Sequence, residues 1–143
     1  MKIERIPPSA IPSIWHKVKP MVDEALVHSN GESLSIDLLE DLLAGESMLL
    51  LGKDDDDEIF SSMIAELQEH PRKKTFYIIT WTTKNRQGFN GWSEIFENEL
   101  VKIAKENKCD YLETWCRKGL AKKLKTQLGW TNEYSVVTKP ITY

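Results

Sequence analysis

The stretch that decides the fold reads Thr80-Trp81-Thr82-Thr83-Lys84-Asn85-Arg86-Gln87-Gly88-Phe89-Asn90-Gly91-Trp92. Residues 74–83, which lead into it, are rich in aromatic and β-branched side chains, and this composition favours a strand. From Trp92 to about Asn107, apolar residues recur at helical spacing. The chain is therefore expected to pass from a strand into a helix through a loop that contains two glycines.

A glycine-containing loop between a strand and a helix suits a phosphate group. Glycine lets the backbone approach a phosphate closely, and the free N–H groups and dipole at a helix N-terminus favour an anion. Two glycines in a loop are also common in ordinary turns, so the pattern leaves both interpretations open. Glu94 and Glu97 fall in the first turns of the predicted helix and would oppose a diphosphate if they faced it.

The segments before this stretch alternate between strand and helix patterns. The expected elements are a strand over 2–6, helices over 9–28 and 34–44, and a strand hairpin made of 47–51 and 59–67. Pro20 lies inside the first helical pattern and is expected to kink or split that helix. Gly45 is expected to end the second helix.

The segments after the stretch continue the alternation. They predict a strand over 110–115, a helix over 117–128 and a final strand over 130–138. The whole order is β-αα-βββ-α-β-α-β, which indicates a mixed α/β sheet with helices on both faces. A length of 143 residues fits a single domain over residues 1–143.

Composition excludes several classes of function. A net charge of −3 argues against a protein that coats duplex nucleic acid, and a pI near 5.7 agrees. No apolar run approaches the ~20 residues that a membrane helix needs, and the N-terminus does not resemble a secretion signal. We therefore expect a cytoplasmic protein that has no membrane segment.

Metal binding is not expected either. Cys109 and Cys116 match no zinc pattern and are expected to be free thiols. The acidic run at 54–58 lacks the spacing and central glycine of a calcium loop, so it is interpreted as a solvated turn.

The element order resembles the GNAT superfamily of N-acetyltransferases along nearly the whole chain, by placement more than by strict motif. In that family the central strand, glycine loop and following helix bind acetyl-coenzyme A, with the pyrophosphate at the helix N-terminus. The run from Tyr111 to Trp115, the helix after it and the pair Gly129-Trp130 also resemble the family. The resemblance implies that the cofactor-binding residues are Trp81, Thr82, Arg86, Gln87, Gly88, Phe89, Asn90 and Gly91.

The chain departs from the family pattern in three ways. The glycines are spaced Gly88-x-x-Gly91, with Arg86 only two residues before the first. Lys125 stands where many family members carry a Tyr that protonates the departing thiolate, and residues 74–83 contain no carboxylate. A small set of bacteriophage proteins is similar in this respect, being GNAT-shaped with eroded catalytic positions.

Three glutamates are candidates for the base that deprotonates an acceptor ammonium: Glu66, Glu69 and Glu113. The alternative for each is a solvent-facing charge at the end or edge of a strand. Glu113 is the preferred base, because its strand would lie beside the cleft between the parallel strands.

These observations lead to two hypotheses about function. The first is an acyl-coenzyme-A-dependent protein, similar to the N-acetyltransferases, that transfers an acetyl group to an unknown amine on a small molecule or a protein. The alternative is a catalytically inactive binding or assembly protein of the same fold, encoded by a bacteriophage. The fold alone does not decide between them.

Overall fold

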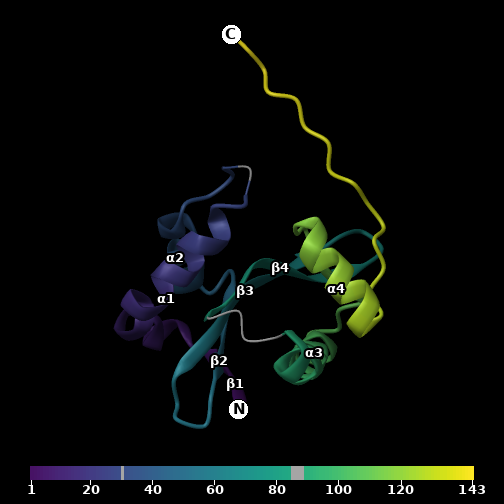
Figure 1. The fold of residues 1–143 in the computed structure, drawn as a ribbon. Helices are drawn as coiled ribbons and strands as arrows, with labels where there is room; N and C mark the ends of the chain where they lie inside the picture. Colours follow the sequence, from purple (N-terminus) through teal and green to yellow (C-terminus); the bar gives the residue numbers. More distant parts are fainter. Residues whose placement is uncertain (30, 85–88) are drawn as a thin grey trace.

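The computed structural model describes residues 1–29, 31–84 and 89–143, and for residues 89–93 only the backbone is described. Its elements are β1 (Lys2–Ile6), a short 3₁₀ turn (Pro8–Ala10), α1 (Ile11–Leu26), α2 (Ser35–Ala44), β2 (Met48–Lys53), β3 (Ile59–Glu69), β4 (Lys74–Thr83), α3 (Phe89–Glu106), β5 (Tyr111–Thr114) and α4 (Lys118–Leu128). Figure 1 shows α1 and α2 on one side of the sheet and α3 and α4 on the other.

The sheet has the strand order β1-β2-β3-β4-β5. The first three pairings are antiparallel, and β4 pairs with β5 in parallel. A parallel pairing needs a crossover connection, which α3 supplies between β4 and β5. The expected mixed α/β sheet with helices on both faces is confirmed.

Two apolar cores lie on the two faces of this sheet. The core on the α3 face contains Met48, Leu50, Phe60, Met63, Ala65, Phe76, Ile78, Phe96, Leu100, Ile103 and Ala104. The core under α1 and α2 contains Ile6, Ile11, Val18, Val22, Leu38, Leu42, Leu49, Leu51 and Ile64. Successive residues of β2, Leu49 to Leu51, alternate between the two cores, because neighbouring side chains of a strand point to opposite faces.

The helix α1 is one continuous helix, so the expected split at Pro20 does not occur. Proline lacks the N–H that would continue the helical ladder, which costs about 3 kcal/mol in a helix interior. Val18, Met21 and Val22 are buried on either side of Pro20, and their packing holds the helix together. At the end of α2, Gly45 has a φ of 75°, a left-handed conformation that glycine adopts without steric cost.

The final strand predicted over residues 130–138 does not form. After α4 the described chain has no helix or strand, and residues 131–143 are exposed throughout. A strand needs a neighbour to complete its ladder, whereas sequence alternation reports only a preference for extended backbone. Figure 1 shows this segment running past α4 and away from the sheet, which explains why it makes no ladder.

Among the described residues, no helix combines the length and the apolar character that crossing a membrane would require.

Candidate functional site

The parallel pairing of β4 with β5 ends before β4 does, because β5 is the shorter strand. Their register runs from Thr75 opposite Tyr111 to Ile78 opposite Thr114 and stops there. β4 continues to Thr83, so residues 79–83 have β3 on one side and, within the described chain, no strand on the other. The backbone groups on that open side of β4 are available to another extended molecule.

A β-bulge lies where the pairing of β4 with β5 ends. Ile64 of β3 is opposite Thr80 and Ala65 is opposite Ile78, which leaves Ile79 as the extra residue of β4. A bulge bends its strand and increases the local twist, so β4 turns at this point. On the β5 side, the hydroxyl of Thr114 donates a hydrogen bond of 3.1 Å to the carbonyl of Ile78 and closes the parallel ladder.

Trp81 and Thr82 are two predicted cofactor-binding residues, and their side chains make contacts within the protein. The Trp81 ring packs against Phe96 of α3, with ring centroids 5.3 Å apart. The buried Thr82 hydroxyl donates a 2.9 Å hydrogen bond to the carbonyl of Met21 in α1. Any contribution of these two residues to binding therefore comes chiefly from their backbone.

The remaining predicted cofactor-binding residues lie at the start of α3. Arg86, Gln87 and Gly88 are outside the described residues, and Phe89, Asn90 and Gly91 form the first helical residues, of which the backbone alone is described. The helix begins at Phe89, three positions before the expected Trp92, and its first turn carries no acidic residue. The earlier start moves Glu94 and Glu97 out of the first turn, and the Glu97 carboxylate accepts a 2.6 Å hydrogen bond from the indole N–H of Trp130. The expected opposition between these carboxylates and an anion at the helix start is thereby reduced.

A row of three polar side chains crosses the sheet one residue before the β4–β5 pairing ends. Glu66 of β3 is opposite Tyr77 of β4, and Tyr77 is opposite Glu113 of β5. Residues opposite one another on paired strands share a face, so the two carboxyl groups flank the Tyr77 phenol. The Tyr77 ring also contacts Trp115 edge to face, at a centroid distance of 5.9 Å.

Tyr77 is the most electrostatically perturbed group of this row. Burial raises the pKa of Tyr77 to about 12, and the negative charges of Glu113, Glu66 and Glu32 act on it in the same direction. Glu32 comes from the connection between α1 and α2. Carboxylates from three separate parts of the chain therefore act on one phenol, which stays neutral at physiological pH.

The three candidate bases do not lie together. Glu66 and Glu113 flank Tyr77, and Glu66 accepts a 3.0 Å hydrogen bond from the Gln68 amide. Glu69 sits at the exposed end of β3, where its carboxylate lies 3.4 Å from the Lys74 ammonium. Sequence reasoning missed Tyr77 as the centre of this group, although the alternation of positions 75–79 in a strongly β-prone strand was a usable signal.

A hollow of about 460 Å³ opens at the connection that carries Glu32. Its lining is mostly apolar and includes Leu26 and Val27 at the end of α1 and Leu34 and Ile36 at the start of α2. Val27, Leu34 and Ile36 are all exposed.

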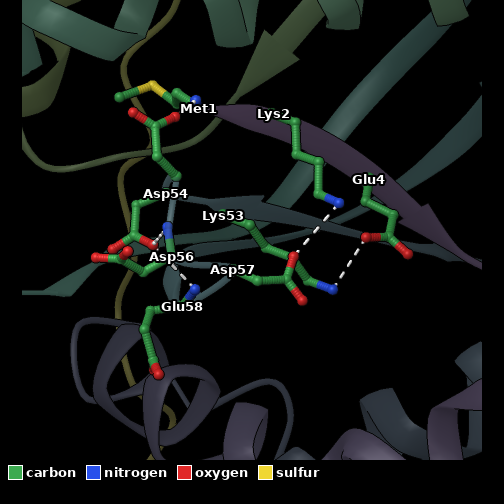
Figure 2. A network of polar contacts seen from close by, with 9 residues as sticks. Met1, Lys2, Glu4, Lys53, Asp54, Asp56, Asp57 and Glu58 are labelled. Atoms are coloured by element: carbon green, nitrogen blue, oxygen red, sulfur yellow. Dashed lines mark hydrogen bonds and ion pairs between the residues drawn. The ribbon is translucent and has the colours of Figure 1, made fainter.

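The acidic run at 54–58 forms the tip of the β2–β3 hairpin (Figure 2). The Asp54 carboxylate accepts 2.9 Å hydrogen bonds from the N–H groups of Asp56 and Glu58. Asp57 lies 3.3 Å from the Lys2 ammonium, and Asp55 pairs with the N-terminal amine. Within the described part of the chain, no group of three or more His, Cys, Asp or Glu side chains is arranged to hold a metal ion.

Comparisons with known proteins identify the fold. No family model matches the chain, and no curated protein matches it either. Among solved structures, a tetramutant of the BH1408 protein from Bacillus halodurans superposes with a TM-score of 0.73 at 17% identity, covering 99% of this chain and 100% of that chain. A ribosomal-protein-alanine N-acetyltransferase from Brucella melitensis biovar Abortus 2308 superposes with a TM-score of 0.72 at 12% identity, with 99% and 100% coverage.

A third solved structure is the aminoglycoside acetyltransferase meta-AAC0020, from an uncultured soil metagenomic sample, in complex with sisomicin. It gives a TM-score of 0.73 at 16% identity, with 99% of this chain and 95% of that chain covered. This chain has the GNAT fold. The similarity extends over almost the whole length of each chain, and identities this low identify the GNAT fold alone. The resemblance to bacteriophage proteins finds no support among these structures and stays a prediction.

Proposed function

We propose that this protein is an acyl-coenzyme-A-dependent N-acetyltransferase that acts on a positively charged amine. One observation carries the proposal: the pairing of β4 with β5 ends at Ile78 and Thr114, whereas β4 continues to Thr83. One side of residues 79–83 therefore has no strand partner within the described chain, and α3 begins shortly afterwards at Phe89. The two features suit the two parts of coenzyme A, an amide-containing arm and a diphosphate.

The described residues fit such a ligand. On the open side of β4, backbone N–H and C=O groups of 79–83 would pair with the amides of the pantetheine arm. The first N–H groups of α3 would receive the pyrophosphate, because they lack acceptors within the helix. The Thr80 hydroxyl, in the same segment, is buried without a hydrogen-bond partner among the described residues. Acetyl-coenzyme A would supply an activated acetyl thioester to this site.

Glu113 is the residue that we assign to removal of the proton from the acceptor ammonium. It lies on β5 opposite Tyr77, one residue before the β4–β5 pairing ends. Burial raises the pKa of Tyr77 to about 12, so the phenol keeps its proton at neutral pH and does not act as a base. Positioning of the two substrates would supply much of the remaining rate acceleration.

The charge around Tyr77 favours a cationic acceptor. Glu66 and Glu113 flank the phenol, Glu32 adds a third negative charge, and the exposed Trp115 offers an aromatic surface that attracts cations. The similar solved structures include an aminoglycoside acetyltransferase and a ribosomal-protein-alanine N-acetyltransferase. The acceptor of this protein would therefore be an amine on a small molecule or a protein. Its two free cysteines suit a reducing compartment such as the cytoplasm.

The alternative is a GNAT-fold binding protein that has lost the chemistry. It is favoured by Lys125, which lies exposed on α4 at the position where many family members carry the Tyr that protonates the departing thiolate. Both functions allow coenzyme A to bind, and only the enzyme then transfers the acetyl group to an amine.

Calorimetric titration with acetyl-coenzyme A, followed by mass spectrometry of an incubation with a panel of diamines and amine-bearing peptides, separates these functions. The proposal expects heat on titration and an acetylated product. Binding without product would support the alternative. Absence of heat at about millimolar acetyl-coenzyme A would contradict the proposal that this cofactor binds.

A further inference from the structure

Two half-buried carboxylates on one face of the sheet have no cation beside them among the described residues. Ile64, two residues before Glu66 on β3, belongs to the core under α1 and α2, so Glu66 and the Glu113 of the same row point to that face. Neither carboxylate forms an ion pair with a described residue, whereas Glu69, further along β3, lies 3.4 Å from the Lys74 ammonium. Partial burial reduces the screening of these charges by water, so the row gains from a positive charge that the described chain does not supply.

The row has places for two positive charges. Neighbouring strands of a sheet lie about 4.8 Å apart, so the backbones that carry Glu66 and Glu113, with β4 between them, lie about 10 Å apart. The Tyr77 side chain lies between the two carboxylates, so each of them borders its own side of the phenol. The rings of Tyr77 and Trp115, with centroids 5.9 Å apart, add an apolar surface beside these charges. Two ammonium groups joined by an aliphatic chain suit this arrangement.

The hydrogen bonding beside Glu66 points to the same kind of ligand. Gln68 lies opposite Thr75 on β4, but its amide donates a 3.0 Å hydrogen bond to the Glu66 carboxylate. The Thr75 hydroxyl is completely buried and has no hydrogen-bond partner among the described residues, which costs free energy. An ammonium group that binds Glu66 would release the Gln68 amide. That amide can then reach Thr75, because residues opposite one another on paired strands have Cβ atoms about 5 Å apart.

We propose that the acceptor is an aliphatic diamine and that Glu66 binds the ammonium group that does not react. This inference rests on the proposed acetyltransferase function and adds the class of its substrate. Glu66 is then a residue that determines specificity, whereas Glu113 acts on the reacting nitrogen. A monoamine of the same length leaves the Glu66 charge without a cation, so the protein is expected to prefer the diamine.

Only one nitrogen of the diamine changes its bonding. Glu113 takes one proton from the reacting ammonium, and the freed lone pair forms a bond to the acetyl carbon of the thioester. The carbon–sulfur bond breaks, its electron pair leaves with the sulfur of coenzyme A, and that sulfur takes up the second proton lost by the nitrogen. The proton on Glu113 returns to water. The other ammonium group keeps its charge throughout, so its contact with Glu66 persists from substrate to product.

Rates with a matched pair of amines test the proposal. A linear diamine of eight carbons and octylamine share one chain and differ in one terminal group. The ratio of kcat/KM for the diamine to that for octylamine is expected to be about tenfold or more. Glu66→Gln keeps the size of the side chain and removes its charge, and it is expected to bring this ratio close to one. Glu69→Gln, a control on the same strand, is expected to keep the ratio. A ratio near one in the unaltered protein, or one that survives Glu66→Gln, overturns the proposal.

Binding without turnover separates this inference from the proposed function. Calorimetric titration of the full chain with each amine, in the presence of coenzyme A that carries no acetyl group, measures recognition alone. The diamine is expected to bind about tenfold more tightly than octylamine, and Glu66→Gln is expected to remove this difference. A preference for the diamine without any acetylated product would contradict the proposed activity and support the site at Glu66. Equal affinities of the two amines would overturn that site, even if both amines are acetylated.

Discussion

Tyr77 of β4 lies opposite Glu113 of β5, within the parallel ladder and one residue before the ladder ends at Ile78 and Thr114. This placement puts a neutral phenol beside a carboxylate close to the end of the β4–β5 pairing. Glu66 lies opposite Tyr77 on the other side, so the phenol is held between two negative charges. Of the two carboxylates in this row, Glu113 is the one on β5, the strand that borders the proposed cleft. Its neighbour Tyr77 keeps its own proton at neutral pH.

The first prediction concerns Glu113 as base. Glu113→Gln keeps the size of the side chain and removes its ability to take a proton. If the protein acetylates an amine, the rate is expected to fall about 10²–10⁴-fold, whereas affinity for acetyl-coenzyme A changes little. Initial rates and calorimetric titration measure the two quantities separately.

The control for this variant is Glu69→Gln. Glu69 lies at the exposed end of β3 beside Lys74, outside the row around Tyr77, and its substitution is expected to leave the rate unchanged. Equal losses in both variants would mean that general negative charge, rather than a base at position 113, supports the activity. No loss in either would remove Glu113 from the mechanism.

The second prediction concerns the stability of the protein in alkali. The pKa of Tyr77 is about 12 in the folded protein, against 10.0 for an ordinary tyrosine, so the folded state holds the proton more tightly than the unfolded state. The resulting stabilisation is complete below pH 10 and is lost as pH rises from about 10 to about 12. In Tyr77→Phe, which cannot ionise, this part of the decline is expected to disappear from urea unfolding curves measured across that range. An unchanged pH dependence in the variant would contradict the assignment.

Much of the fold could be predicted because several segments carry strong and local signals. Residues 74–83 combine aromatic and β-branched side chains, and 92–107 follow a helical repeat, so β4 and α3 lie close to their expected bounds. Pro20 was expected to kink or split its helix, and the split does not occur, because buried neighbours keep α1 continuous. The prediction of a strand over 130–138 was wrong for a different reason. Its local preference is present, but its own sheet provides no ladder for it.

The candidate site was harder to predict because it depends on register. Glu113 was selected from the position of its strand, and the structure places it in one row with Glu66 and Tyr77. One sequence does not reveal which residues of three strands face one another, and an aromatic residue within a β-prone strand resembles a core residue. Tyr77 therefore drew no attention, although burial raises the pKa of its phenol and the surrounding carboxylates act in the same direction.

The third prediction concerns Thr82, whose side chain links β4 to α1. Its buried hydroxyl donates a 2.9 Å hydrogen bond to the Met21 carbonyl. Thr82→Val keeps the shape and leaves that carbonyl without its donor, and this is expected to lower the free energy of unfolding by about 1–3 kcal/mol. The matched control is Thr126→Val on α4, where an exposed hydroxyl donates to the Lys122 carbonyl at 2.8 Å. Its effect is expected to stay within about 0.5 kcal/mol, and similar losses in both variants would contradict the role of Thr82.

The last prediction concerns the anchor between α3 and the root of the C-terminal arm, residues 131–143. The Trp130 indole N–H donates to the Glu97 carboxylate at 2.6 Å, and the Trp130 ring packs against the core on the α3 face. Trp130→Phe keeps an aromatic ring and removes the donor, and it is expected to cost about 1.5–3 kcal/mol because the acceptor is charged. Glu97→Ala removes the other partner, and the double variant is expected to lose less than the sum of the two single losses, since they break the same bond. Denaturant unfolding of the four proteins measures this coupling. Additive losses would mean that Trp130 contributes only through packing, and the arm would then leave the domain without a polar anchor.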